Sequence, residues 1–221
     1  MKEKTNLPYE RIMTGLLLGI AAFFLFSAPP LIFYIVCIAC SFFIIRTELP
    51  QLARTKIDYG ALALFYIGVP FALGMHLYSN PLYRPLFIVL VALTISNDIG
   101  AYVAGSLWGR RLIAPSISPK KSWEGFLGGC VIVLFSLCTI TYFFLPHPLP
   151  YIFLLGFSIV VAMFATMGDF FESWLKRRAG IKDAGACLPG HGGLLDRFDS
   201  LIFVISIGYL CKDYIIPHLF G

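Results

Sequence analysis

Long apolar runs are the feature that most constrains the fold of this chain. Each run is about 17 to 25 residues long, the length that an α-helix needs to cross the hydrocarbon core of a bilayer. Hydrophobic residues make up 58% of the 221 residues and charged residues only 13%, which is too apolar for a soluble domain of this size. The runs lack the polar–apolar alternation of a membrane barrel. The sequence therefore predicts an all-α, polytopic integral membrane protein.

About seven transmembrane helices account for the apolar runs. We expect them near Ile12–Ser27, Leu31–Ile45, Gly60–Leu77, Leu86–Leu107, Gly125–Leu145, Tyr151–Met167 and Leu201–Pro217. Pro70 lies inside the third helix and predicts a kink there. Recognisable motifs begin only after residue 85. The chain is therefore expected to divide into N-terminal membrane helices, residues 1–85 with about three spans, and a motif-bearing membrane region, residues 86–221 with about four spans and two cytoplasmic loops.

The positions of the positive charges predict the orientation in the membrane. If the chain starts in the cytoplasm and crosses seven times, fifteen of its 17 Lys and Arg residues fall on the cytoplasmic side. Only Arg84 and Lys212 fall outside. This distribution places the N-terminus and the polar segment Gly168–Ser200 in the cytoplasm. Because the cations are spread among hydrophobic spans, they do not indicate a nucleic-acid-binding protein.

The polar segment Gly168–Ser200 is the most informative stretch for function. As a helix, its first part would place Asp169, Glu172, Ser173 and Lys176 on one face. A second helix, beginning near Leu194, would place Asp196, Asp199 and Ser200 on one side. Clustered carboxylates repel one another unless a cation binds, so the segment predicts a divalent metal with oxygen ligands, most simply Mg²⁺ beside phosphates. The residues alone therefore indicate metal-assisted chemistry on a phosphate close to lipid.

Two further polar blocks lie upstream. Asn97 and Asp98 fall inside the fourth apolar run, where a carboxylate is costly and normally marks function. A single buried hydrogen bond to a neighbouring helix is the alternative explanation. The block Ser118–Gly125 combines hydroxyls and two ammonium groups, which suit a polyphosphate, with Trp123, which could stack on a base or anchor the chain at the membrane interface. Residue types alone favour the anchoring role.

These blocks together resemble the phosphatidate cytidylyltransferase (CDP-diacylglycerol synthase) family. About a dozen positions of the family pattern are fixed across 27 residues, and all are retained: Ser173, Lys176, Arg177, Lys182, Asp183, Gly185, Pro189, His191, Gly192, Gly193, Asp196, Arg197 and Asp199. The blocks around Asp98 and Ser118–Gly125 keep the family's order. The resemblance implies that residues 86–221 form the catalytic region, with the active site at the cytoplasmic ends of the C-terminal helices.

The resemblance also implies a reaction and its reactants. A phosphatidate oxygen attacks the α-phosphorus of CTP, which gives CDP-diacylglycerol and pyrophosphate, and Mg²⁺ supports this attack. The expected partners are CTP, phosphatidic acid and membrane lipids, at a bacterial inner membrane. Whether a monovalent cation joins Mg²⁺, and whether the chain forms a homodimer, stays open.

The resemblance carries residue roles onto this chain. The expected metal ligands are Asp169, Asp196 and Asp199, which with Ser173, Lys176 and His191 make up the catalytic group. The expected substrate-binding residues are Asp98, Ser118, Lys120, Lys121, Ser122, Trp123, Arg177, Lys182, Asp183, Gly192, Gly193 and Arg197. His191 could donate to a phosphate, carry a proton or simply hold the loop. The backbone N–H groups of Gly192 and Gly193 could bind an anion.

A few positions depart from the family pattern. Ser122 replaces a threonine and keeps the hydroxyl, and Ile99 replaces a small hydroxyl residue. The chain is also shorter at its N-terminus than many members. The alternatives are another membrane enzyme that uses CTP, such as an archaeol cytidylyltransferase or a polyprenol kinase, and a transporter that uses Asn97 and Asp98 for ion passage.

Overall fold

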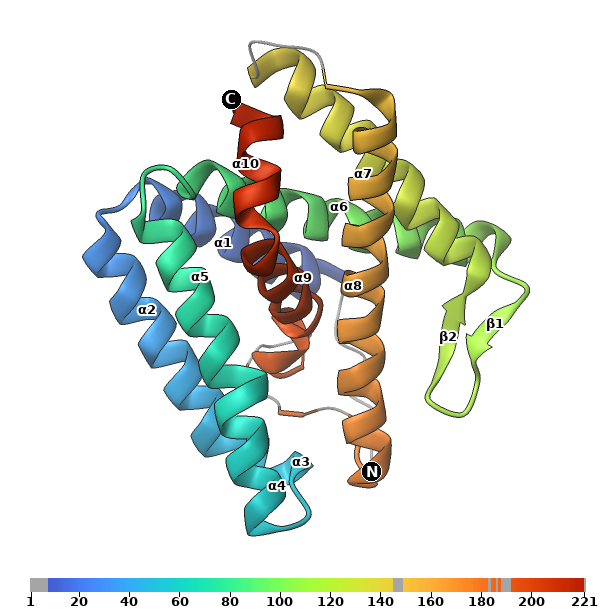
Figure 1. The fold of residues 1–221 in the computed structure, drawn as a ribbon. Helices are drawn as coiled ribbons and strands as arrows, with labels where there is room; N and C mark the ends of the chain where they lie inside the picture. The colour runs from blue at the N-terminus through green and yellow to red at the C-terminus, as the bar shows by residue number, and fades with distance from the viewer. Residues whose placement is uncertain (1–7, 145–148, 183, 186, 188–191, 221) are drawn as a thin grey trace. The chain divides into compact units, whose positions relative to one another are not determined.

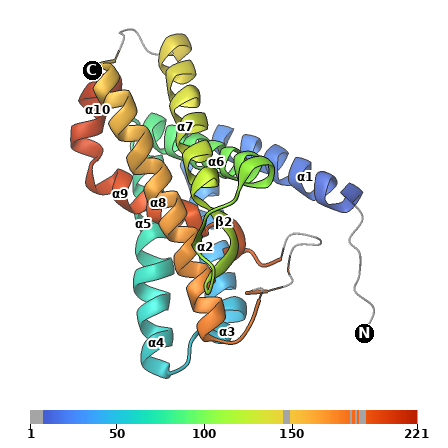
Figure 2. The same ribbon diagram turned by 90° about the vertical axis from the view of Figure 1, so that its right-hand side faces the viewer.

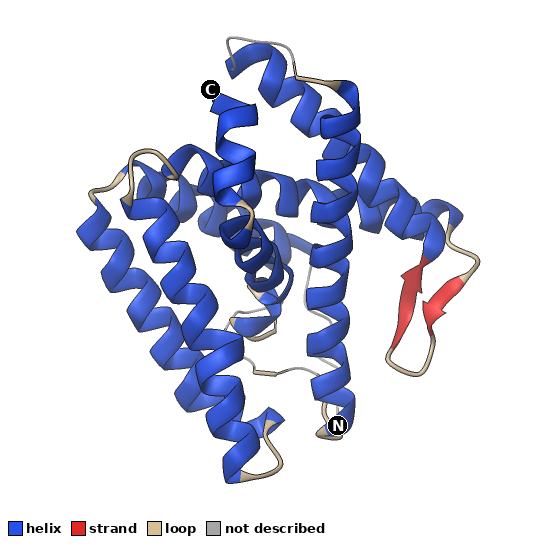
Figure 3. Ribbon diagram, in the orientation of Figure 1, coloured by secondary structure: helices blue, strands red, loops and turns tan. Residues whose placement is uncertain are grey.

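The computed structural model describes residues 8–144, 149–182, 184, 185, 187 and 192–220, and nearly all of them are helical (Figures 1 and 3). The helices before the two strands are α1 (Pro8–Ser27), α2 (Pro30–Phe43), the π-helix η1 (Ile44–Glu48), α3 (Leu49–Leu52), α4 (Lys56–Ala61), the π-helix η2 (Leu62–Gly68), α5 (Val69–Ser79) and α6 (Arg84–Trp108). After the strands β1 (Leu112–Ala114) and β2 (Ser118–Ser122) follow α7 (Trp123–Phe144), α8 (Tyr151–Arg178), the 3₁₀-helix η3 (Leu195–Arg197), α9 (Asp199–Leu210) and α10 (Lys212–Phe220).

Five helical stretches are long and apolar enough to cross a membrane: Pro30–Leu52, Lys56–Ser79, Arg84–Trp108, Trp123–Phe144 and Tyr151–Arg178. They match the second to sixth predicted spans. Large apolar side chains on their surfaces are highly exposed, for example Phe135 at 69% and Ile152 at 82%, as expected of helices that face lipid. The protein is therefore an integral membrane protein.

The predicted seventh span is not a straight helix. α9 and α10 meet at an angle of 83°, and the pair counts as a sixth span only if it crosses as one broken helix. Polar contacts lie at the bend: the Tyr83 hydroxyl donates to Asp213 at 3.0 Å, and the Lys212 ammonium lies 4.6 Å from the centre of the Tyr209 ring. The first predicted span is helical within α1, but several of its side chains lie outside the described part of the chain. The count of seven therefore stays a prediction.

The chain forms two compact units, Met1–Met75 with Leu175–Phe198, and His76–Trp174 with Asp199–Gly221. α8 contributes residues 151–174 to the second unit and residues 175–178 to the first. The polar segment is thus shared between the two units. The predicted division into residues 1–85 and 86–221 concerned motifs rather than contacts, and it stays a prediction.

The first unit is built on two broken helices that lie side by side, and each contains a π-helical segment before a proline (Figures 1 and 2). η1 ends two residues before Pro50, and η2 ends two residues before Pro70. A proline ring clashes with the carbonyl group four residues earlier, and the wider π turn makes room for it. The structure therefore accommodates Pro70, where we expected a kink, by a π segment.

Close contacts between small residues define the second unit. A Cβ atom added to Gly128 of α7 would lie 2.2 Å from the Cβ of Ala104 of α6, so the two helices touch almost backbone to backbone. A Cβ atom on Gly168 of α8 would lie 2.3 Å from the carbonyl oxygen of Asp199. The first turn of α9 is therefore pressed against α8 at the level of Asp169.

A short antiparallel hairpin, β1–β2, occupies the loop between α6 and α7 and is the departure from the all-α prediction (Figures 2 and 3). Leu112 pairs with Ser122 and Ala114 with Ser118. Glu124 closes the base of the hairpin by accepting the N–H groups of Arg110 and Arg111, both at 3.1 Å. The block Ser118–Ser122 is thus a strand that leads directly into α7.

Candidate active site

The last turn of α8 carries Lys176, which faces the loop around Asp196. The helix stops in a Schellman motif, in which the N–H of Ile181 bonds the carbonyl of Lys176 at 3.0 Å and the N–H of Gly180 bonds that of Arg177 at 3.1 Å. Gly180 adopts φ 74°, a conformation that favours glycine. The predicted helix through Lys176 is confirmed, and the helix ends with its three basic residues.

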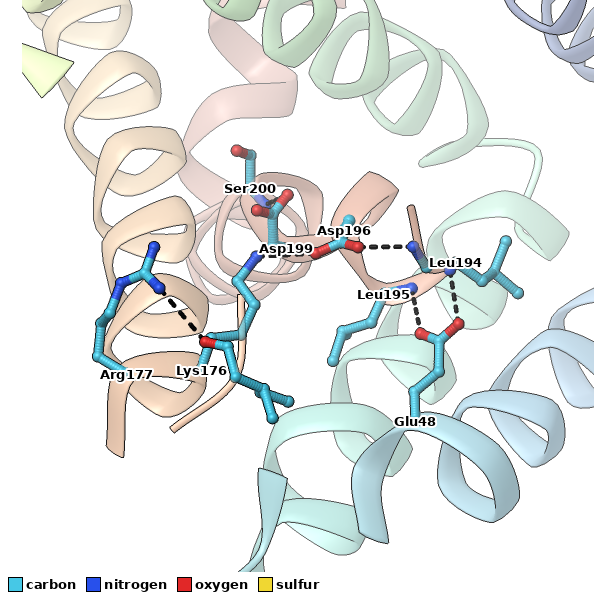
Figure 4. A network of polar contacts seen from close by, with 10 residues as sticks. Glu48, Lys176, Arg177, Leu194, Leu195, Asp196, Asp199 and Ser200 are labelled. Carbon is cyan, nitrogen blue, oxygen red and sulfur yellow. Dashed lines mark hydrogen bonds and ion pairs between the residues drawn. The ribbon is translucent and has the colours of Figure 1, made fainter. Parts of the chain in front are cut away.

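Lys176 and Asp196 form the centre of a polar cluster in the first unit (Figure 4). The Lys176 Nζ lies 2.8 Å from Asp196 Oδ1, and both side chains are 12% exposed. The other oxygen of Asp196 accepts the N–H of Gly193 at 2.6 Å. Gly192 has φ 81°, and a Cβ atom there would lie 2.7 Å from Asp196 Oδ2. The glycines therefore let the loop close around the Asp196 carboxylate, and the Gly193 N–H, proposed as an anion donor, bonds within the loop.

Glu48 completes this cluster, although it belongs to none of the motifs found in the sequence. Its two carboxylate oxygens accept the N–H groups of Leu194 and Leu195, each at 2.7 Å (Figure 4). Glu48 is only 1% exposed, although it ends the π-helix of a region in which no motif is recognised. The one available signal was a single carboxylate at the edge of an apolar run, directly before Leu49 and Pro50.

A second polar cluster lies in the second unit, where α8 meets the start of α9. The carboxyl group of Asp199 is hydrogen bonded to that of Asp169 and lies close to that of Glu172. Glu172 is 1% exposed and Asp199 7%. The ammonium of Lys121, from strand β2, pairs with Asp169 and lies 5.1 Å from the centre of the Phe170 ring. Carboxyl groups this close together repel one another when ionised, which favours the binding of a cation or a proton.

The predicted helix that carried Asp196 and Asp199 together is wrong. Asp196 lies in the 3₁₀-helix η3, and α9 begins only at Asp199. Phe198 separates the two elements with φ −107° and ψ −9°, and the N–H groups of Leu194 and Leu195 are bound by Glu48 instead of beginning an α-helix. Asp196 and Asp199 consequently lie in different elements, η3 and α9.

The predicted residues between Ser118 and Trp123 differ in burial and in their contacts. Ser122 is 4% exposed, and its hydroxyl accepts the N–H of Gly125 at 3.1 Å, so it caps α7. This contact explains why serine can replace threonine. Trp123 is 52% exposed and packs edge-on against Phe126. Ser118 is half-buried and Lys120 is exposed, which leaves Lys120 accessible to a ligand.

The remaining predicted residues differ in accessibility. Asp98 is exposed on α6, whereas its neighbour Asn97 is 2% exposed and donates to Asp98 Oδ1 at 3.4 Å. Ser173 is half-buried on α8. The exposed cations are Arg177, Lys182 and Arg197. Asp183 and His191 lie outside the described residues.

Comparison with known proteins identifies the family. Residues 52–215 match the model of the cytidylyltransferase family, a range that contains both polar clusters except Glu48. The chain belongs to this family. A phosphatidate cytidylyltransferase from Rickettsia bellii is 34% identical over 213 residues, which cover 93% of this chain and 90% of the relative.

Two further relatives carry the same name. Phosphatidate cytidylyltransferase from Bacillus subtilis is 42% identical over 155 residues, 70% of this chain and 57% of the relative. That from Staphylococcus saprophyticus is 40% identical over 149 residues, 66% of this chain and 55% of the relative. The matched part of the chain thus spans little more than half the length of these two relatives.

The donor chemistry of the second cluster fits a hard divalent cation. Within the described part of the chain, no group of three or more His, Cys, Asp or Glu side chains is arranged so that it could hold a metal ion by itself. Mg²⁺ does not need such a group, because it is commonly bound by one or two carboxylates together with substrate phosphates and water. Asp169 and Asp199, which touch each other, meet that requirement.

Proposed function

We propose that this protein is a phosphatidate cytidylyltransferase, which transfers CMP from CTP to phosphatidic acid and releases pyrophosphate. The observation that carries the proposal is the match to the Rickettsia bellii relative, which extends over 93% of this chain. The distribution of Lys and Arg residues supports a bacterial inner membrane location with the N-terminus and the polar loops in the cytoplasm. CTP would then reach the site from water and phosphatidate from the bilayer.

The cations of the polar segment would bind the reactants. Arg177, Lys182 and Arg197 are exposed, so the phosphates of CTP can reach them from solvent. Lys176 is mostly buried beside Asp196 and is held in one position, which suits a group that acts on charge developing in the transition state. Lys120 and Trp123 remain accessible for the nucleotide.

Asp169 and Asp199 would hold Mg²⁺, whereas Asp196, predicted as a third ligand, has its two oxygens bound by Lys176 and by the N–H of Gly193. Bound there, Mg²⁺ would neutralise charge on the triphosphate. The reaction itself needs no protein nucleophile. An ionised phosphatidate oxygen forms the new bond to the α-phosphorus of CTP, the bond from that phosphorus to the bridging oxygen breaks, and pyrophosphate leaves with the electron pair.

Labelled CTP tests the proposal directly. Protein purified in detergent is incubated with Mg²⁺, phosphatidate and CTP that carries label at either the α- or the γ-phosphate. Label from the α position should enter the lipid, and EDTA should stop the transfer. Label from the γ position would identify a lipid kinase instead, and transfer only to an ether-linked lipid acceptor would change the substrate but keep the chemistry.

A further inference from the structure

Glu48 binds the backbone of the loop that carries Asp196, although the two lie far apart in the sequence. Leu194, whose N–H it accepts, is 146 residues away. Three consecutive N–H groups are bound by carboxylates, that of Gly193 by Asp196 and those of Leu194 and Leu195 by Glu48. The orientation of the Asp196 side chain therefore depends on a backbone that Glu48 holds.

Two glycines of this loop, Gly185 and Gly193, lie close to the Glu48 carboxylate. A Cβ atom on Gly185 would lie 2.8 Å from Glu48 Oε1, and one on Gly193 would lie 3.0 Å from the same carboxylate. The backbone can approach the carboxylate closely at both positions because both residues are glycine. Leu195, directly before Asp196, is fully buried. The carboxylate thus contacts the loop on both sides of the segment that lies outside the described residues.

An isolated buried carboxylate is unfavourable, but two charge-assisted hydrogen bonds of 2.7 Å compensate for much of the lost hydration. Each oxygen accepts a backbone N–H and the side chain is buried, so the carboxylate is directed at the loop backbone. This geometry makes Glu48 an anchor for the loop rather than a group that touches the reactants.

We propose that Glu48 is a positioning residue of the active site: it fixes the backbone of Gly193–Leu195 and thereby aligns Asp196 with Lys176. The inference rests on the proposed function for its catalytic part. The N-terminal helices would then contribute directly to the catalytic geometry, through the last residue of the π-helix η1.

The substitution Glu48→Gln tests the inference with little change in shape. The amide presents an NH₂ group where one backbone N–H now finds an acceptor, so one hydrogen bond becomes a repulsive contact. Asp58→Asn is the matched control, because it also removes a carboxylate charge in the first unit but lies in a half-exposed pair with Arg178. Glu48→Asp, which keeps the charge but is shorter, is the second variant.

Amide hydrogen exchange provides a readout that does not depend on the identity of the substrate. In Glu48→Gln, exchange in residues 192–198 should accelerate by about tenfold or more, with α7 unchanged. In the labelled-CTP assay, kcat of Glu48→Gln should fall by about 10- to 100-fold, with KM for CTP changed much less. The reason is that a shift of a catalytic group by about 1 Å lowers the rate by such a factor. The exchange rate and kcat of Glu48→Asp should lie between those of the wild type and of Glu48→Gln. Both quantities in Asp58→Asn should match the wild type.

Unchanged exchange in residues 192–198 would overturn the inference, whatever the activity. If amide exchange in residues 192–198 of Glu48→Gln is faster but its turnover stays within twofold of the wild type, the positioning role is also overturned. If Glu48→Gln does not fold, the same measurements on Glu48→Asp decide. If the protein transfers no label to any lipid, the proposed function fails, while the exchange result still tests the anchor.

Discussion

Lys176 Nζ lies 2.8 Å from Asp196 Oδ1, and this contact joins the last turns of α8 to the loop before α9 within one compact unit. Both partners are mostly buried, and the second oxygen of Asp196 is bound by a backbone N–H. An ion pair in such a place orients both groups, and the two side chains should therefore behave as a unit when they are mutated.

Single substitutions in this pair should be costly and strongly coupled. Lys176→Met and Asp196→Asn should each abolish most turnover and destabilise the protein by about 2–4 kcal/mol, because each leaves a buried group without its partner. The double variant should lose at least about 1 kcal/mol less than the sum. Denaturation in detergent and the labelled-CTP assay measure both effects, and additive losses or near-normal activity of Asp196→Asn would contradict the assignment.

The pair between Arg178 and Asp58 should behave differently. Its side chains are 26% and 31% exposed, and exposed ion pairs contribute about 1 kcal/mol or less. Asp58→Asn should therefore shift the unfolding free energy by no more than this amount and leave turnover unchanged. A loss of activity comparable with that of Lys176→Met would mean that both pairs serve the site.

Gly168→Ala should destabilise α8 against α9. The new Cβ atom would lie 2.3 Å from the Asp199 carbonyl oxygen and 2.9 Å from the Ser200 Cα, and neither backbone atom can move cheaply. We expect a loss of about 1–3 kcal/mol together with lower activity. Gly156→Ala in the same helix is the control, because nothing lies within 4 Å of its Cβ position, and it should be neutral or stabilising.

Alanine substitutions at the two glycines with positive φ distinguish the effect of backbone strain from the effect of a new contact near Asp196. Gly180→Ala and Gly192→Ala should both cost about 1 kcal/mol or more, since both positions have left-handed backbone angles. Only Gly192→Ala places a Cβ atom near Asp196, at 2.7 Å, whereas Gly180 has open space. Turnover should therefore fall clearly in Gly192→Ala alone, and equal kinetics in the two variants would remove Gly192 from the site.

The sequence determined the membrane helices and the motif from which the site is predicted. Apolar runs predicted five helices that the structure contains, because a span must satisfy its own backbone hydrogen bonds and cover its whole length with apolar side chains. The motif residues in the polar segment were likewise visible, since their spacing and type are local properties. The predicted helix through Lys176 was correct for the same reason.

The tertiary structure decided which of these residues meet. No periodicity connects Glu48 with Leu194, Lys121 with Asp169, or Asp196 with Lys176, because each contact joins segments that are distant in sequence. The break between η3 and α9 also depended on packing: Glu48 binds two N–H groups of the loop, and Gly168 lets the first turn of α9 lie against α8. Local sequence fixes what a segment can form, whereas long-range contacts select where it begins and what its side chains touch.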